Sequence, residues 1–86
     1  GKKKPQVLAS ASREEQEECG KGWYSYVAKS PAETSNVSRV LLPSCPKSVT
    51  VDGKEVFDTK RWHAASHTYL IEFENNPDGV SVKFCW

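Results

Sequence analysis

Hydrophobic and polar residues alternate along most of the chain from residue 22 onward, and a period of two is typical of β-strands that bury one face. Short stretches rich in Pro, Gly, Asn and Ser separate the alternating segments and favour turns. The pattern predicts six strands, at residues 22–29, 36–43, 48–52, 54–58, 68–74 and 80–86. A single six-stranded sheet would leave one apolar face uncovered. We therefore predict a mainly β fold, a six-stranded antiparallel β-sandwich or small barrel.

The dipeptide Asp52-Gly53 marks the most specific turn of the sequence. It stands between two short alternating runs. The type I′ turn of a tight hairpin needs positive φ at both central residues, which Asp and Gly tolerate. Such a turn would place Thr50 opposite Glu55. The sequence therefore predicts a hairpin formed by the two strands that flank this dipeptide.

The segment NNPDG at residues 75–79 predicts a second hairpin, between the last two strands. Pro77 and Gly79 occupy the second and fourth positions that these residue types prefer in a type I turn. In the register that this turn favours, apolar residues of the two strands meet on one side of the sheet. The expected pairs are Phe73 with Val82, Ile71 with Phe84, Tyr69 with Trp86, and Glu72 with Lys83.

The N-terminal part of the chain shows no strand pattern. Residues 1–11 contain three consecutive lysines and small residues without periodicity, which predicts a disordered, solvated tail. In SREEQEECG, Ser12 and Glu15 match a helix capping box and Gly20 matches a helix stop, although no apolar stripe would hold the helix in place. We expect a flexible tail with a short helix at most over residues 1–18, and a single β domain over residues 19–86.

Composition and charge narrow the classes of function. The 86 residues are 37% hydrophobic, which suits one small domain with a marginal core. Twelve basic and eleven acidic residues leave a net charge of +1, so the chain lacks the dense positive field of a typical nucleic-acid-binding protein. No apolar run approaches the roughly 18 residues of a membrane helix. We expect a monomer with a protein partner, no membrane contact and no nucleic acid.

Three cysteines, Cys19, Cys45 and Cys85, permit one disulfide and one free thiol. A core this small gains most from a bridge, and bridges persist in secreted domains, so the cysteines favour secretion. Asn36-Val37-Ser38 matches the acceptor pattern for N-glycosylation and points the same way.

His63 and His67 have the spacing of two metal ligands on one helix face. The strand predicted from residue 68 breaks that geometry, and the sequence has neither HExxH nor a Cys-x-x-Cys pair. We therefore expect no metal, no cofactor and no catalytic role for these histidines.

The nine aromatic residues exceed what so small an interior can hold, so some of them should lie at the surface. Aromatic and arginine side chains dominate the energetics of protein interfaces. We predict that Arg39, Arg61 and Trp62 anchor a protein partner, with the segment VSRVLL around Arg39 forming an exposed strand edge.

A cysteine just before the first of six short strands, together with SHTYLI and CPKSVTVDGKEV, resembles the Magnaporthe Avrs and ToxB-like (MAX) effectors of plant-pathogenic fungi. The resemblance covers residues 19–86. It implies a six-stranded antiparallel β-sandwich that is secreted and translocated into the host. Members of that family bind host proteins by surface patches or exposed strand edges and perform no catalysis.

The predicted topology favours a Cys19–Cys45 bridge, because consecutive antiparallel strands bring the start of the first beside the end of the second; Cys19–Cys85 stays open as the alternative. The chain is also similar to the ribonuclease-like secreted proteins of fungi. Catalysis there would need a general base, a general acid and a cationic contact, for which His67, Glu72 and Arg61 are the nearby trio. RNA binding without catalysis would use Lys60-Arg61-Trp62. We expect a protein-binding domain and no enzyme.

Overall fold

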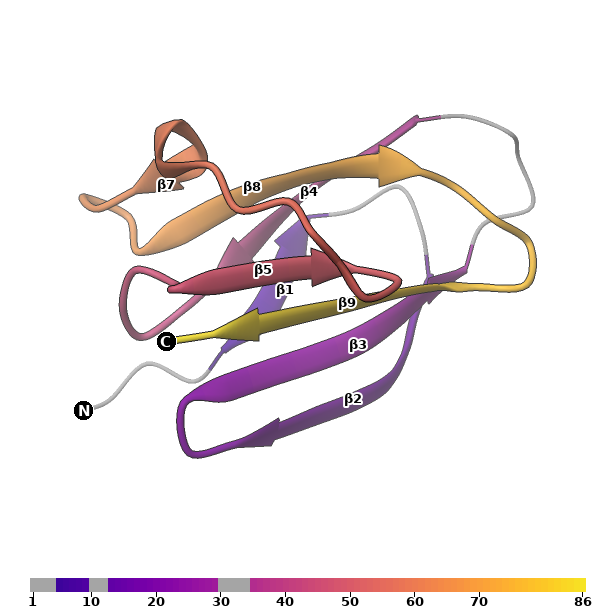
Figure 1. The fold of residues 1–86 in the computed structure, drawn as a ribbon, viewed down its shortest axis with the longest axis horizontal. Helices are drawn as coiled ribbons and strands as arrows, with labels where there is room; N and C mark the ends of the chain where they lie inside the picture. Colours follow the sequence, from indigo (N-terminus) through magenta and orange to yellow (C-terminus); the bar gives the residue numbers. More distant parts are fainter. Residues whose placement is uncertain (1–4, 10–12, 30–34) are drawn as a thin grey trace.

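The strands of the chain form two antiparallel sheets that pack face to face as a β-sandwich (Figure 1). The computed structural model describes residues 5–9, 13–29 and 35–86. Sheet A has the strand order β1-β4-β8-β7, with bounds β1 Gln6–Ala9, β4 Ser35–Leu41, β7 Trp62–His63 and β8 Thr68–Glu74. Sheet B has the order β2-β3-β9-β5-β6, with bounds β2 Arg13–Gly20, β3 Trp23–Lys29, β5 Ser48–Val51, β6 Lys54–Glu55 and β9 Val80–Cys85. A short 3-10 turn, η1 (Thr59–Arg61), precedes β7.

The core lies between the two sheets and is made by alternate side chains of their central strands. Burial alternates along β3, β4 and β9, as it must when only one face of each sheet meets the other. The rings of Tyr26 and Tyr69 and of Phe84 are fully buried, and Phe84 contacts both tyrosines. The buried hydrophobic residues are Tyr24, Tyr26, Ala28, Val40, Leu42, Val49, Tyr69, Ile71, Phe73, Val80, Val82 and Phe84.

All six predicted strands are present, and the sandwich is confirmed. The structure adds three strands to them: the short strands β1 and β7, and the eight-residue edge strand β2. The hairpin at Asp52-Gly53 is confirmed, because both residues have positive φ (51° and 81°) and Thr50 pairs with Glu55. Strand β6 ends at Glu55, earlier than expected, although the main-chain N–H of Val56 still donates to the carbonyl of Val49 at 2.7 Å.

The predicted N-terminal helix is wrong. Residues 13–20 form strand β2, which pairs with β3 at the edge of sheet B and shifts its register beside Gln16, where φ is +50°. A charged, bulged segment suits an edge strand, because it needs no buried face of its own and resists further pairing. The glycine expected to end a helix instead ends β2 one residue before a tight turn, in which Gly22 has φ +78°.

The flexible tail predicted over residues 1–18 is also wrong where the structure describes it. Strand β1 pairs with β4 in sheet A, and β2 belongs to sheet B, so ordered structure begins well before residue 19. The lysines at positions 2–4 lie outside the described residues. None of the described residues belongs to a helix long and apolar enough to cross a membrane.

The pairing predicted for the last two strands is wrong. Strand β8 pairs with β4 and β7 in sheet A, whereas β9 pairs with β3 and β5 in sheet B. The turn itself forms, since the N–H of Gly79 donates to the carbonyl of Asn76 at 2.9 Å, but the chain crosses there from one sheet to the other. The expected pairs Phe73–Val82, Ile71–Phe84, Tyr69–Trp86 and Glu72–Lys83 therefore do not form. Alternation specifies which face of a strand is buried, and it is satisfied equally when the two strands face each other across the core.

Candidate functional site: the open edge of strand β8

Strand β8 is paired along its whole length on one side and only at its beginning on the other. Strand β4 pairs with every residue from Thr68 to Glu74. Strand β7 pairs only with Thr68 and Tyr69. Within the described part of the chain, residues 70–74 therefore have no strand beside them on the β7 side.

The direction of the backbone groups along this edge follows from one hydrogen bond. The N–H of Leu42 donates to the carbonyl of His67 at 2.8 Å, so His67 directs its carbonyl toward the β4 side. Residues of an antiparallel strand alternate in the side toward which they direct N–H and C=O. Leu70, Glu72 and Glu74 accordingly direct their backbone groups toward the open side, where another strand could pair with them.

A hollow of about 220 Å³ lies beside the open edge. Its wall is formed by the aliphatic side chain of Val56, by acidic and basic residues, and by the beginning of β8. This volume fits one or two side chains, and the mainly polar lining suits a polar or charged group. The lining residues are Val56, Asp58, Arg61, Tyr69, Leu70, Ile71 and Glu72.

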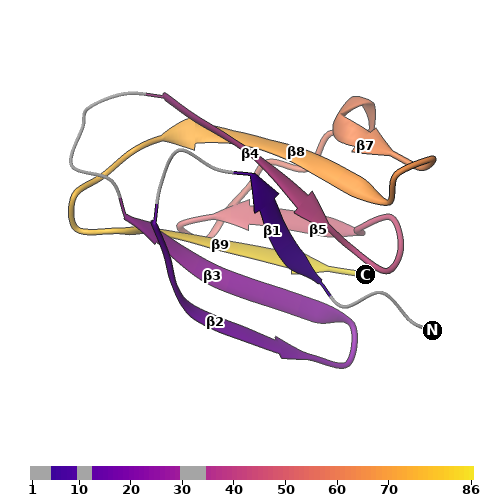
Figure 2. The same ribbon diagram turned by 180° about the vertical axis from the view of Figure 1, so that it is seen from behind.

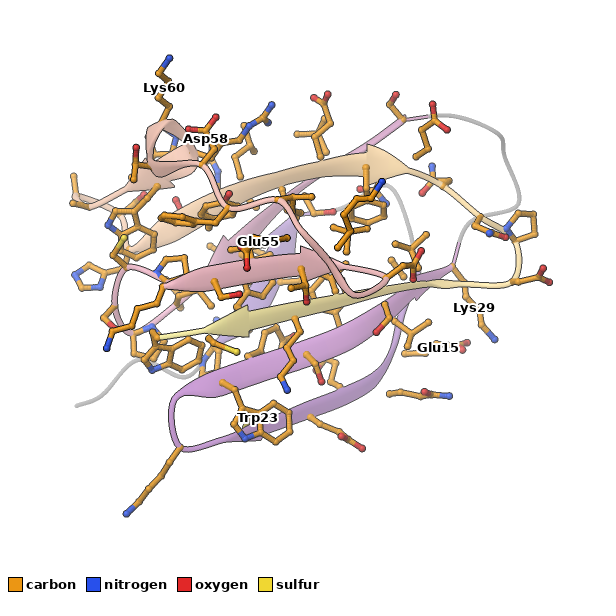
Figure 3. All side chains as sticks on the ribbon, in the orientation of Figure 1. Glu15, Trp23, Lys29, Glu55, Asp58 and Lys60 are labelled. Atoms are coloured by element: carbon orange, nitrogen blue, oxygen red, sulfur yellow. The ribbon has the colours of Figure 1, made fainter. Side chains whose placement is uncertain are left out.

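Hydrogen bonds hold the connection from Val56 to Arg61, which forms the wall of the hollow opposite β8. The N–H of Asp58 donates to the hydroxyl of Tyr69 at 2.9 Å, and the Asp58 carboxylate accepts from the N–H of Lys60 at 3.0 Å, which caps η1. The Phe57 ring stacks on Tyr69 with centroids 6.0 Å apart. Figure 3 shows Asp58 and Lys60 together at this end of the molecule. Burial raises the pKa of Tyr69, so its hydroxyl stays protonated and accepts the Asp58 bond as a neutral phenol.

Glu55 fixes the start of the same segment. Its carboxylate accepts hydrogen bonds from the Ser48 hydroxyl at 2.5 Å, from the N–H of Val49 at 3.0 Å and from the N–H of Phe57 at 3.2 Å. The hydrogen bond from Ser48, followed by that from Val49, lowers the pKa of Glu55. The label in Figure 3 places Glu55 beside β5. The segment that closes the hollow is therefore anchored at both ends, on sheet B by Glu55 and on sheet A by Tyr69.

Two of the three predicted anchors lie around this edge. Arg61 lines the hollow. Arg39 is exposed on β4, where its register partner is Leu70, which also lines the hollow. Trp62 is different, because its half-buried side chain packs against the core and lies edge-on to His67 with centroids 6.0 Å apart.

The prediction that VSRVLL forms an exposed strand edge is wrong. This segment belongs to β4, which lies between β1 and β8 in sheet A and is paired on both sides. The outer face of β4 remains open to solvent, and Val37 is 47% exposed there. Arg39 can therefore contact a partner with its side chain, while the backbone of this segment is occupied.

The two histidines do not share a helix face. His63 ends β7, and His67 has φ +55° in the turn before β8, with Nδ1 3.2 Å from the carbonyl oxygen of Pro43. Among the described residues no three or more His, Cys, Asp or Glu side chains are placed to hold a metal ion. The ribonuclease-like trio is only partly assembled, because Arg61 and Glu72 line the hollow and His67 does not. That the chain binds no metal and is no enzyme stays a prediction.

The three cysteines, all of which are described, are free thiols, so the predicted Cys19–Cys45 bridge is not formed in this structure. The alternative with Cys85 is out of reach. Cys19 pairs with Tyr24 on β3, and Tyr24 pairs with Phe84, the neighbour of Cys85, on β9. Cys19 and Cys85 therefore lie two strand spacings apart, which puts their Cα atoms about 10 Å from each other. A disulfide needs Cα atoms within about 7 Å.

The glycosylation pattern lies inside the sandwich. Asn36 is fully buried, and its side-chain amide nitrogen donates to the Asn75 side-chain oxygen at 3.1 Å. The Asn36 oxygen in turn accepts a hydrogen bond from the hydroxyl of buried Ser38 at 2.6 Å. A glycan would have to be attached to this buried nitrogen, so the folded chain cannot carry one there.

The sequence did not indicate Val56, Asp58 or Tyr69 as site residues. One local signal was available for Asp58, since an Asp two residues before Lys60 can accept a hydrogen bond from that residue's N–H and start a turn. The hydrogen bond from Asp58 to Tyr69 joins residues that precede η1 and follow β7 in the sequence. No local sequence pattern predicts it.

No protein-family model, no curated protein and no solved structure matches this chain. The geometry of the open edge and the sequence pattern alone support the function proposed below.

Proposed function

We propose that this chain is a small secreted, non-catalytic protein-binding β domain that acts on a host protein. The proposal combines the sequence resemblance to MAX effectors with the open edge of β8. Secretion and translocation into host cells rest on the resemblance. Binding rests on the edge and on the side chains around it.

The observation that carries the proposal is the half-paired edge of β8 beside the hollow. An extended segment of a partner can add to such an edge through main-chain hydrogen bonds, while alternate side chains enter a neighbouring pocket. Leu70 and Glu72 would supply the main-chain groups. The hollow between Val56 and Ile71 would take a side chain of the added strand.

The charges around the edge favour a different protein as partner over a second copy of the chain. In an antiparallel pairing of two copies centred on Glu72, each Glu72 would face its own counterpart, and like charges directly opposite each other are destabilising. A partner strand with a basic residue at that position would pair favourably. This agrees with a monomeric chain that binds another protein.

The arginines supply the side-chain part of the interface. Arg61 lines the hollow, and Arg39 stands beside Leu70 on the outer face of sheet A. The net charge of +1 provides little long-range steering, so affinity would depend on these short-range contacts.

The test uses a proline at the open edge and a control that keeps the backbone. Glu72→Pro removes an N–H directed away from β4, whereas Glu72→Gln keeps that N–H and removes only the charge. The probe is a displayed library of random peptides of about six to ten residues, the length of one strand, selected on the folded full chain. We expect the selected peptides to lose about tenfold in affinity or more with Glu72→Pro, since a lost hydrogen bond costs about 0.5–1.5 kcal/mol and the ring adds a clash.

Equal binding of these peptides to wild-type chain and to Glu72→Pro, with both folded by circular dichroism, would contradict an edge-based function. Single-stranded RNA is titrated in parallel at low and moderate salt. Tight RNA binding that falls steeply with salt, without peptide selection, would favour the RNA-binding alternative instead.

A further inference from the structure

Strand β4 is held unequally by its two neighbours. Strand β8 pairs with all seven residues from Ser35 to Leu41 in an uninterrupted register. Among the described residues, strand β1 pairs with three residues of β4, and its register shifts between Val7 and Ala9. Figure 2 shows β1 beside β4, at the edge of sheet A. Strand β1 is therefore the weaker neighbour by number of main-chain pairs.

The side chains of β1 add little to this hold. Of the three β1 side chains whose burial the structure describes, at residues 6–8, none belongs to the buried core, and Val7 packs against it half-buried. Gln6 is exposed, and Leu8 is 48% exposed. Hydrophobic stabilisation grows with the apolar area that is buried, so half-buried Val7 contributes less than a fully buried valine would.

Arg39 and Leu41 mark the side of β4 that β1 occupies. Since the N–H of Leu42 donates toward β8, alternation directs the backbone groups of Leu41 and Arg39 toward β1. These two residues are also the register partners of Gln6 and Ala9. Loss of β1 would leave an open edge with Arg39 in its middle and leave the β4–β8 pairing intact.

We propose that the β4 edge is a second strand-binding site, separate from the β8 edge, which the chain closes with its own strand β1. The ligand is an extended polypeptide segment with an aliphatic residue in the place of Val7 and, like β1, with a solvent-exposed residue on either side of it. Binding would exchange β1 for that segment. The observed β1 is itself an example of a strand that fits this edge.

The first test measures amide hydrogen exchange by NMR in the full chain. Val7→Asp places a charge on a β1 side chain that packs against the core, and Leu8→Asp places the same charge on the neighbouring exposed side chain as a matched control. In Val7→Asp we expect exchange at Arg39 and Leu41 to accelerate about tenfold or more, while Ser38 and Val40, whose backbone faces β8, stay protected. In Leu8→Asp all four amides should behave as in the wild type.

Faster exchange at Ser38 and Val40 together with Arg39 in Val7→Asp would show that β1 is an integral part of the fold and would overturn the proposal. Unchanged exchange at Arg39 and Leu41 would overturn it as well, because β1 would then not depend on Val7.

The second test adds a synthetic peptide with the sequence of residues 3–11, KKPQVLASA. An attached segment competes at an effective concentration in the millimolar range, so the wild-type chain should bind the peptide at least tenfold more weakly than Val7→Asp does. The same peptide with Asp in place of its valine should not bind. Failure of the unchanged peptide to protect Arg39 and Leu41 in Val7→Asp would contradict strand exchange.

Discussion

The main-chain N–H of Asp58 donates a hydrogen bond of 2.9 Å to the phenolic oxygen of Tyr69. Asp58 belongs to the connection from sheet B to sheet A, and Tyr69 lies at the point where the pairing of β8 with β7 ends. The bond therefore holds the wall of the hollow against the open edge. If the edge binds a partner, this contact positions the surface that the partner meets.

Replacing Tyr69 with Phe tests this contact. The Phe ring keeps the stacking with Phe57 and removes only the acceptor for the Asp58 N–H. We expect the free energy of unfolding to fall by about 0.5–1.5 kcal/mol in chemical denaturation, and the Asp58 amide to exchange faster with solvent. Wild-type stability together with wild-type exchange at Asp58 would show that the bond has no role in holding the wall.

The carboxylate of Glu55 makes stability depend on acid. Its three hydrogen bonds lower its pKa in the folded chain, so the folded state binds this proton less readily than the unfolded state does. The stabilisation is complete above the ordinary pKa of a glutamate, about 4.3, and is lost as pH falls through the lower folded pKa. Glu55→Gln should be less stable than wild type near neutral pH, and the difference should shrink in acid. A difference that is constant with pH in denaturation experiments would contradict this assignment.

Asn36 should carry no glycan when the chain is made through a eukaryotic secretory pathway and folds. The reason is its full burial and its hydrogen bond to Asn75. Ala64→Asn provides the matched control, because it creates the acceptor pattern before Ala65 and Ser66 in an exposed turn. Intact mass should show a glycan on the folded Ala64→Asn variant and none on the wild type. A folded wild-type chain with a glycan on Asn36 would contradict the placement of β4.

Arg61 and Trp62 should differ in what they contribute. Arg61→Ala removes a side chain of the hollow and should weaken binding of an edge-bound peptide by about 1–3 kcal/mol with little change in the thermal midpoint. Trp62→Ala removes a half-buried ring that packs against the core and should lower the thermal midpoint, with a cost on the order of 1–3 kcal/mol. Titration calorimetry and thermal unfolding of both variants check this. Equal effects of the two substitutions on stability would contradict their placement.

The strands could be predicted from the sequence because burial of one face imposes a period of two, and this period is intact in segments such as β3 and β4. The Asp52-Gly53 hairpin could be predicted because its backbone needs those two residue types locally. The pairing of β8 and β9 could not be predicted in the same way. Both strands bury alternate residues in the same core, and that pattern is identical whether they are neighbours in one sheet or lie in opposite sheets.

The candidate site could be predicted only in part for a related reason. Arg61 was identified from its residue type, but the edge exists because β7 is only two residues long and pairs Trp62 with Tyr69. No alternation marks so short a strand. The helix predicted around Glu15 failed because its capping signals are local, whereas pairing of β2 with β3 is a tertiary interaction that outweighs them.

The most direct test of binding at the β8 edge is the amide hydrogen exchange of the full chain, measured by NMR with and without a peptide selected as described above. We expect the amides of Leu70 and Glu72 to gain protection on binding, while Tyr69 and Ile71, whose backbone already faces β4, change little. Binding of the peptide with no gain at Leu70 and Glu72, or with the gain at other strands instead, would contradict it.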